Sequence, residues 1–205
     1  VVGLGAIGAM VANLAIKFGM EVIGYDPFLS VNAAWSLDHN VKHAETLDTL
    51  LTKSDYVTLH VPQTNDTKGM INANTLKIMK NGVRILNLAR GGLVNNADIL
   101  DAIASGKVAA LVTDFAAEEF IGNPKIICLP HLGASTPEAE ENCAEMAVKE
   151  LRDFLENGNI VNSVNFPRTV TDNPIPVGGT RLCVSHKNEP GMVSKFTTIL
   201  GEAKL

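Results

Sequence analysis

Residues 1–26 read "VVGLGAIGAMVANLAIKFGMEVIGYD", and Gly3, Gly5 and Gly8 in this stretch form the pattern G-x-G-x-x-G. Alone, the pattern is a weak signal. Here two apolar residues precede the first glycine, a helical pattern follows the third, and Asp26 closes the next apolar run. This is the order of a βαβ unit whose glycines let the backbone approach a pyrophosphate at a helix N-terminus. The stretch therefore predicts a dinucleotide-binding fold, and a purely structural glycine turn is the less favoured alternative.

Asp26 indicates which dinucleotide binds. A carboxylate at the end of the second strand can accept hydrogen bonds from both hydroxyls of the adenosine ribose. The same carboxylate would repel a 2′-phosphate. We therefore expect NAD rather than NADP as the cofactor.

The rest of the first 158 residues alternates short apolar runs with helical patterns. We expect strands at 21–25, 56–61, 83–89, 110–115 and 125–130, and helices at 6–19, 95–106 and 137–158. This alternation predicts an α/β fold with a doubly wound parallel sheet and helices on both faces. The strands are continuous apolar runs because both faces of a parallel sheet are covered.

The last of these helices has clear ends. Ser135 and Glu138 form a capping box with Pro137 in the first turn, and Gly158 ends the helix. Residues 1–158 are therefore expected to form the cofactor-binding domain.

The chain beyond Gly158 changes in composition. Residues 159–179 are rich in Asn, Pro, Gly and Thr, which is typical of a linker. A strand at 180–187 and a helix are expected to follow. Residues 180–205 would then be the start of a second domain.

Composition excludes several classes of function. The 205 residues are 46% hydrophobic, which supports a well-filled core. The net charge is −5 and no Lys or Arg run occurs, so we do not expect nucleic acid as a partner. No apolar stretch approaches the ~20 residues of a membrane span, so no membrane partner is expected. Since the chain opens inside an expected strand and without Met, we expect a fragment that lacks its own N-terminus.

The cysteines and histidines show no metal-binding pattern. The three cysteines have no CxxC spacing, and the five histidines have no HxxxH or similar spacing. We expect no metal site. Reduced thiols in the cytoplasm fit this cysteine usage best.

Polar side chains follow several expected strands. The loop at 60–72 is full of small polar residues, and an ordinary loop is an equally good interpretation of it. Arg90 follows the strand at 83–89 and offers a planar fork for a carboxylate, although a structural ion pair is an alternative. Acidic residues and a histidine follow the next two strands: Asp114, Glu118, Glu119 and His131. Ligands bind at this edge of doubly wound sheets, so we expect an Arg, an acid and a His to face the nicotinamide.

With these motifs the chain resembles the D-isomer-specific 2-hydroxyacid dehydrogenases. The resemblance covers essentially all 205 residues and rests on "GLGAIG" with Asp26, "HVPQTNDTKGMI", "NLARGGLVN", the acidic segment after "VTD", "PHLGASTPEAEENCA" and "NSVNFP". It is strongest with the branch that oxidises 3-phospho-D-glycerate to 3-phosphooxypyruvate in L-serine biosynthesis and carries a C-terminal ACT domain. It implies an NAD-dependent oxidoreductase that assembles as a homo-oligomer, at least a dimer.

The resemblance implies that Arg90, Glu119 and His131 are catalytic. Arg90 would hold the substrate carboxylate and C2 oxygen, His131 would accept the hydroxyl proton, and Glu119 would hydrogen-bond the imidazole. The family commonly has Asp-Val-Phe before its acidic residues, where this chain has Asp114-Phe115-Ala116. Counting from the aspartate favours Glu119 and aligning the phenylalanine favours Glu118. We take Glu119.

The same matching implies a set of cofactor contacts. They are Gly3, Gly5, Ala6, Ile7, Gly8, Asp26, His60, Pro62, Leu88, Ala89, Arg90, Asp114, His131, Gly133 and Ala134. Leu88 and Ala89 would contribute backbone atoms, and Asp114 would bind the carboxamide. In the family, groups that bind the substrate phosphate precede the glycine turn. We therefore expect this chain to bind NAD but not to convert the substrate.

Residues 185–192 read "SHKNEPGM" and admit two interpretations. A strand that runs into a turn explains every residue. By resemblance, the segment is instead the first strand and turn of an ACT domain, in which His186 and Asn188 bind L-serine as an effector. The pair would then act on the nicotinamide site through coupling between domains.

Other functions stay open on the sequence alone. A relative that acts on glycerate, lactate or hydroxypyruvate would share the cofactor site, and the ACT-like tail disfavours it. Corepressors of the same fold use NAD to control assembly and bind proteins, and the presence of Arg90, Glu119 and His131 argues against that class.

Overall fold

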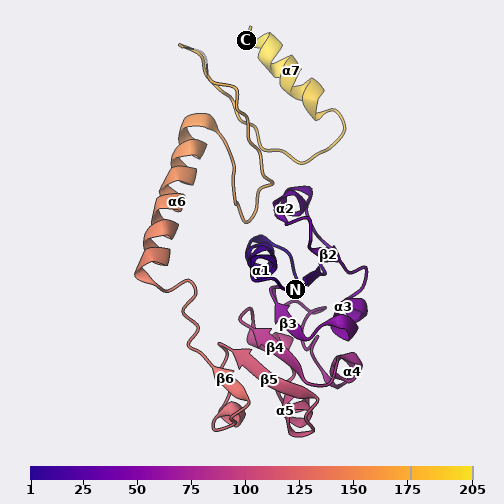
Figure 1. Ribbon diagram of the computed structural model, residues 1–205. Coiled ribbons are helices and arrows are strands. Elements are labelled where there is room, and N and C mark those ends of the chain that lie inside the picture. The colour runs from indigo at the N-terminus through magenta and orange to yellow at the C-terminus, as the bar shows by residue number, and fades with distance from the viewer. Residues whose placement is uncertain (176, 205) are drawn as a thin grey trace. The chain divides into compact units, whose positions relative to one another are not determined.

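The computed structural model describes residues 1–175 and 177–204 (Figure 1). The chain divides into two compact units, Val1–Leu132 and Gly133–Leu205. The first unit contains the sheet, and the second contains the longest helix.

The first unit is built on short parallel strands. They are β1 (Ile23–Gly24), β2 (Lys42–His43), β3 (Tyr56–Leu59), β4 (Val83–Asn87), β5 (Val108–Thr113) and β6 (Ile126–Cys128). Four of them form one sheet in the order β3-β4-β5-β6, and β1 pairs with β2. Every ladder is parallel, which confirms the predicted α/β fold.

Val2 connects the two sheets. It forms parallel bridges to Tyr25 and to Leu59. Its N–H donates to the carbonyl oxygen of Thr58 at 2.9 Å, and its carbonyl oxygen accepts from the N–H of His60 at 2.7 Å. The segment around Val2 therefore lies between β1 on one side and β3 on the other, and the order of the strands reverses there. Ligands of doubly wound sheets bind at such a reversal of strand order.

Helices connect the strands of the first unit. They are α1 (Ala6–Lys17), α2 (Val31–Ser36), α3 (Leu47–Lys53), α4 (Ala73–Ile78) and α5 (Asn96–Ala104), with the 3₁₀ turns η1 (Gly91–Leu93) and η2 (Glu118–Phe120). Side chains of the residues before α2, α3, α4 and α5 accept hydrogen bonds from the first turn of each helix. Of these helices the sequence predicts α1 and α5 only, because helices of six or seven residues show too few turns for a clear period.

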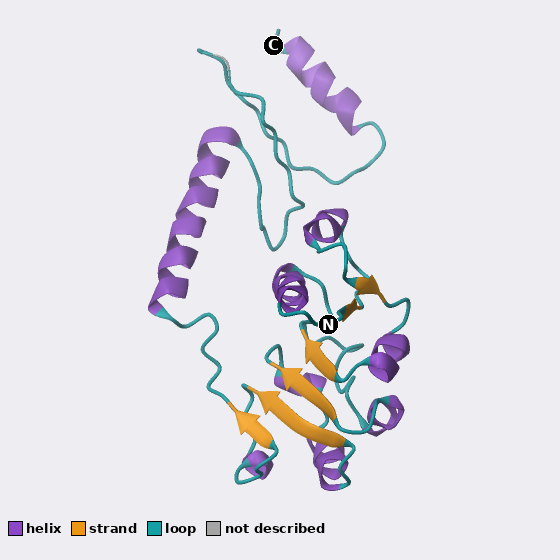
Figure 2. Cartoon of the chain, viewed as in Figure 1, coloured by secondary structure: helices purple, strands orange, loops and turns teal. Residues whose placement is uncertain are grey.

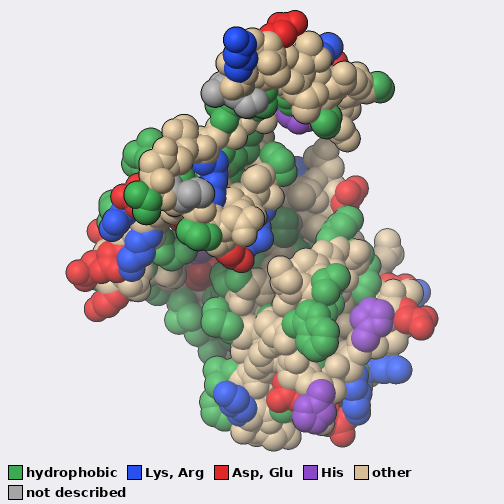
Figure 3. Space-filling view, turned by 90° about the horizontal axis from the view of Figure 1, so that it is seen from above, with side chains coloured by type: hydrophobic (Ala, Val, Ile, Leu, Met, Phe, Trp, Pro, Cys, Tyr) green, Lys and Arg blue, Asp and Glu red, His purple; other side chains and the backbone are tan. Residues whose placement is uncertain are grey.

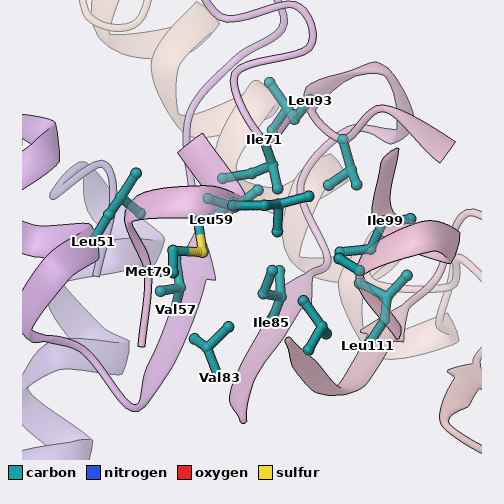
Figure 4. Packing of buried hydrophobic residues seen from close by; sticks show 14 of the residues in the cluster. Leu51, Val57, Leu59, Ile71, Met79, Val83, Ile85, Leu93, Ile99 and Leu111 are labelled. Carbon is teal, nitrogen blue, oxygen red and sulfur yellow. The ribbon is translucent and has the colours of Figure 1, made fainter. Parts of the chain in front are cut away.

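The core of the first unit surrounds the central strands (Figure 4). Leu59, Ile85 and Leu111 come from three neighbouring strands and pack with Leu51 and Ile99 from helices, and all five are buried. Each such side chain contributes about 1.5–3 kcal/mol when it leaves water. This packing fixes the carboxyl ends of the strands, where the predicted site residues lie.

The second unit begins with α6 (Pro137–Asn157). The predicted capping box of Ser135 and Glu138 is wrong, because the cap is Thr136, whose hydroxyl accepts from the first turn at 3.2 Å. The helix starts one residue later than the box requires. Gly158 ends the helix with φ +72°, as predicted.

Charged residues of α6 form exposed pairs along the helix. Glu145 pairs with Lys149 and Glu156 with Arg152, each at 2.9 Å. Exposed pairs of this kind contribute only about 0.3–0.5 kcal/mol. Acidic and basic side chains are interspersed on the face seen in Figure 3. Of the helices in the described residues, none has both the length and the apolar character to cross a bilayer.

The described chain between α6 and α7 (Met192–Glu202) is loop, apart from one antiparallel bridge of Ile160 with Thr169 (Figure 2). The expected helix after residue 187 is confirmed by α7. The expected strand at 180–187 is wrong, because a strand requires a hydrogen-bonded neighbour and none is present in the described part of this segment. The segment is held to the end of α6 by the guanidinium of Arg181, which donates to the carbonyl oxygen of Asn157 at 2.7 Å.

Candidate active site

The glycine turn follows Val2 and has the form that the sequence predicts. Gly3 has φ +86°, and a Cβ there would lie 2.7 Å from the carbonyl oxygen of His60. A Cβ on Gly8 would collide with the carbonyl of Gly3. Gly5 caps α1 without a side chain, and a Cβ there would meet no atom within 4 Å. Packing thus requires glycine at positions 3 and 8, and Gly5 leaves open space before the first turn of α1.

The structure brings Asp26 to this turn. Its carboxylate accepts from the N–H of Leu4 and from the N–H of Phe28, both at 2.8 Å. Ala6 and Ile7 form the exposed first turn of α1 beside it. An anion can therefore approach the helix N-terminus, and a hydroxyl can reach the carboxylate.

His60 and Pro62 follow β3. The Nε2 of His60 lies 3.0 Å from the hydroxyl of Thr58. Burial, and then the positive charge of the N-terminus, lower the pKa of His60 below its usual range. The carbonyl oxygen of Pro62 accepts from the hydroxyl of Thr67 at 2.6 Å, which holds the loop in a turn.

Arg90 follows β4 in a turn that Asn87 organises. The buried amide of Asn87 donates to the carbonyl oxygen of Arg90 at 2.9 Å. The guanidinium donates to the carbonyl oxygen of Ala89 at 2.7 Å and is otherwise exposed. Leu88, also predicted to face the cofactor, is 43% exposed in the same turn.

Two residues that hold this turn were not predicted from the sequence. Asn87 is a polar interruption of the apolar run "VRILN", and that interruption is a usable signal. Gln63 accepts from the N–H of Gly92 at 3.1 Å across 29 residues, and no local signal predicts this contact.

His131 follows β6 and pairs with Asp114 at the end of β5. Its Nδ1 lies 2.8 Å from Oδ2 of Asp114. The side chain of Asp114 is 11% exposed and that of His131 is 51% exposed. The ring of Phe115, which sequence reasoning missed, lies 4.7 Å from the imidazole between centroids.

Glu119 lies in η2 and has a different partner. Its Oε1 accepts from the side-chain amide of Asn96 at 2.9 Å. Its own backbone N–H, and then this amide, lower the pKa of Glu119. The structure does not join Glu119 or Glu118 to His131 by a hydrogen bond among the described residues. The catalytic role of Glu119 stays a prediction.

Two hollows flank the sheet of the first unit. One of about 220 Å³ lies at the carboxyl ends of β4 and β5, where Asn87, Asn96 and Thr113 supply polar groups. The larger, of about 810 Å³, is lined by residues such as Tyr56 and Lys80, and no predicted site residue lines it. No predicted site residue lines the smaller hollow either, although Gly91 and Phe115, which follow Arg90 and Asp114 in the chain, are among its lining residues.

The remaining predicted residues belong to the second unit. Gly133 and Ala134 lie before α6. The ring of His186 packs edge-on against Phe196 of α7 at 5.2 Å, and its Nδ1 lies 2.8 Å from the carbonyl oxygen of Lys187. Asn188 is exposed. Within residues 1–175 and 177–204, no three His, Cys, Asp or Glu side chains form a group that could hold a metal ion.

Comparison with known families identifies the first unit. Residues 1–133 match the family described as D-isomer specific 2-hydroxyacid dehydrogenase, NAD binding domain. D-3-phosphoglycerate dehydrogenase of Bacillus subtilis strain 168 is 37% identical over 178 residues, which are 84% of this chain and 33% of that protein. The human protein of the same name is 36% identical over 171 residues, which are 80% of this chain and 32% of that protein. The chain thus spans about a third of the length of these relatives.

Solved structures show the same fold. A glyoxylate reductase from Paecilomyes thermophila is similar with a TM-score of 0.69 and 30% identity, over 80% of this chain and 51% of that chain. D-lactate dehydrogenase from Aquifex aeolicus, in complex with NAD and lactic acid, has a TM-score of 0.63 and 30% identity, over 75% of this chain and 52% of that chain.

Proposed function

Because the chain belongs to the D-isomer-specific 2-hydroxyacid dehydrogenases, we propose that it is the cofactor-binding part of an enzyme that oxidises 3-phospho-D-glycerate to 3-phosphooxypyruvate. The observation that carries the substrate assignment is the identity of 35–39% to relatives named D-3-phosphoglycerate dehydrogenase. That reaction begins L-serine biosynthesis.

NAD fits the residues present. Gly3 and Gly8 admit no side chain, Gly5 leaves space before α1, and Asp26 stands at the ribose position. Asp114 adds a buried Oδ1 without a hydrogen-bond partner among the described residues, suited to the carboxamide. The backbone of Leu88 and Ala89, together with His60 and Pro62, completes the proposed set in the first unit. Bound NAD supplies the acceptor for the hydride.

Arg90 and His131 would act on the substrate. The exposed guanidinium binds the carboxylate and C2 oxygen as a planar fork, since among the described residues only one of its donors is engaged, with Ala89. His131 accepts the hydroxyl proton at Nε2 in the oxidation and returns it in the reduction. Glu119 is retained in the catalytic set on the family resemblance.

The C-terminal part of the second unit, from residue 180 on, is proposed to carry regulation. Residues 1–158 would form the cofactor domain, 159–179 the linker and 180–205 the start of an ACT domain. L-serine would bind at His186 and Asn188, which is supported by the position of His186 against Phe196 and by the exposure of Asn188. We expect a homo-oligomer in the cytoplasm, consistent with the three free cysteines.

The rate of NADH oxidation by the full-length protein tests the assignment. We expect 3-phosphooxypyruvate to be preferred over pyruvate and hydroxypyruvate, and L-serine to lower the rate. A preference for an unphosphorylated acid, with no effect of serine, would support a relative such as the D-lactate or glyoxylate enzymes and reject the substrate assignment. His186→Ala, beside the matched exposed change Lys187→Ala, tests the effector site separately.

A further inference from the structure

We infer that Gln63 is a positioning residue for Arg90, an inference that rests on the proposed function for the substrate that Arg90 binds. The Oε1 atom of Gln63 accepts from the N–H of Gly92 at 3.1 Å. Gly92 lies in η1, the 3₁₀ turn that follows Arg90 directly. A side chain from the loop after β3 thus holds the turn that presents the guanidinium at the end of β4.

The turn has no cap from its own first residue. Arg90 occupies the N-cap position of η1, and its side chain caps no backbone N–H there. A guanidinium has only donors, so it cannot accept from the N–H groups that are free at the start of a turn. In most helices the N-cap side chain accepts from the N–H two or three positions later. Gln63 makes this bond to Gly92, the second residue of η1, from 29 residues away.

The contact with Gln63 explains why position 92 is a glycine. A Cβ on Gly92 would overlap Oε1 of Gln63 and would lie 2.6 Å from its Cδ and 2.8 Å from its Nε2. The three nearest atoms therefore all belong to one side-chain amide. The φ angle of Gly92 lies outside the left-handed region, so the backbone there would accept any L-residue. The neighbouring amide, rather than the path of the chain, requires the glycine.

The loop that carries Gln63 is held on both sides of it. On one side, the hydroxyl of Thr67 donates to the carbonyl oxygen of Pro62 at 2.6 Å. On the other, the N–H of Ile71 donates to the carbonyl oxygen of Leu93 at 3.0 Å, and both of these side chains are fully buried in the core (Figure 4). Removing the amide of Gln63 should therefore leave the backbone of the loop in place, including the proposed cofactor contact at Pro62.

A positioning role predicts a change on the substrate side only. In the full-length enzyme, Gln63→Met keeps the length of the side chain and removes the acceptor. The turn then holds Arg90 less precisely, so kcat/KM for the 2-oxo acid that the wild type reduces best should fall about fivefold or more. The dissociation constant of NADH and the melting temperature should be unchanged. Asn65→Ala, an exposed change in the same loop, is the control and should leave all three quantities unchanged.

Gly92→Ala breaks the same contact from the other side. Its Cβ displaces the flexible end of the Gln63 side chain, so kcat/KM should fall as in Gln63→Met while the protein stays folded. In the double variant Gln63→Ala/Gly92→Ala the amide is absent and the Cβ has room. The loss of kcat/KM should then equal that of Gln63→Ala alone. Losses that multiply in the double variant would overturn the inference, because the two residues would act independently.

Hydrogen exchange reports on the cap without turnover. In the peptide that contains residues 90–94, one amide should exchange about fivefold faster in Gln63→Met than in the wild type or in Asn65→Ala. Exchange that is the same in all three proteins, an unchanged kcat/KM in Gln63→Met, or an equal loss of NADH affinity would overturn the inference. A protein whose exchange depends on Gln63 but which reduces no 2-oxo acid would reject the proposed function and leave the cap of η1 intact.

Discussion

The glycine turn and the edge that presents Arg90 and His131 are held by different forces. At the turn, Gly3 and Gly8 are buried and no side chain fits, so the path of the backbone is set by steric exclusion. At the edge, Arg90 and His131 are exposed, and the side chain of each makes one hydrogen bond to another described residue. The cradle for the cofactor is therefore complete without a ligand. The proposed catalytic side chains depend on single partners, and changing one partner should affect chemistry without affecting the fold.

The largest effect is expected at Gly8. Gly8→Ala forces a Cβ into the carbonyl of Gly3, which cannot move because Gly3 is packed against His60. We expect the free energy of unfolding to fall by about 3 kcal/mol or more and NADH binding to be lost. Urea unfolding and NADH fluorescence measure these two effects.

Gly5→Ala is the matched control for Gly8→Ala. Its new Cβ meets no atom within 4 Å, so the free energy of unfolding should change by less than about 1 kcal/mol. NADH should nevertheless bind at least about tenfold more weakly, because the methyl group occupies the approach to the helix N-terminus. Equal stability of both variants would show that the turn is not set by exclusion.

Arg90→Ala should damage only the chemistry. A charge-assisted hydrogen bond between Arg90 and the substrate carboxylate would contribute about 1.5–3 kcal/mol of binding free energy, so kcat/KM should fall about 10- to 100-fold. The melting temperature should hardly change, because within the described part of the chain the guanidinium bonds only the adjacent Ala89 carbonyl. Arg84→Ala is the control, since Arg84 lies over the ring of Tyr56 on β3, away from this turn. Unfolding of Arg90→Ala would contradict the separation of the two regions.

The same contrast explains what the sequence could predict. The glycine turn is determined by residues within a few positions of one another, and its form followed from the spacing of Gly3, Gly5 and Gly8. The partners at the edge are 17 residues apart for Asp114 and His131, and 23 for Asn96 and Glu119. Which acidic side chain forms a hydrogen bond with which donor depends on how the folded sheet places these residues. No local pattern encodes that choice.

The expected strand at 180–187 shows the same limit. The apolar content of this segment favours a strand, but hydrogen bonds from a neighbour decide whether one forms. Gly158, in contrast, ends α6 as predicted because a left-handed residue after a helix is a local requirement.

Asp26→Ala tests the link between the turn and cofactor choice. Removing the carboxylate abolishes both the ribose acceptor and the repulsion of a 2′-phosphate, so the preference for NAD over NADP should fall about tenfold or more. It also frees the N–H groups of Leu4 and Phe28, so a small loss of stability is expected. Asp48→Ala removes an exposed acid of α3 as the control. An unchanged cofactor preference, measured by the ratio of dissociation constants, would remove Asp26 from the ribose site.

The smallest effect is expected from His60, which lies between the two regions. Burial first, and then the N-terminal charge, lower its pKa in the folded state from the usual 6.5. Below pH 6.5 the unfolded chain therefore binds more protons at this position than the folded chain does. The contribution of His60 to stability is fully present above that pH and is lost as the pH falls toward the folded-state value.

His60→Gln should remove this part of the acid dependence of the melting temperature, while His43→Gln, at an exposed position on β2, should retain it. A steeper fall with acid in His60→Gln would show that the folded protein favours the protonated imidazole. The half-buried ring of His60 would then be charged in the folded protein, and the steric account of Gly3, which rests on the His60 backbone, would be unaffected.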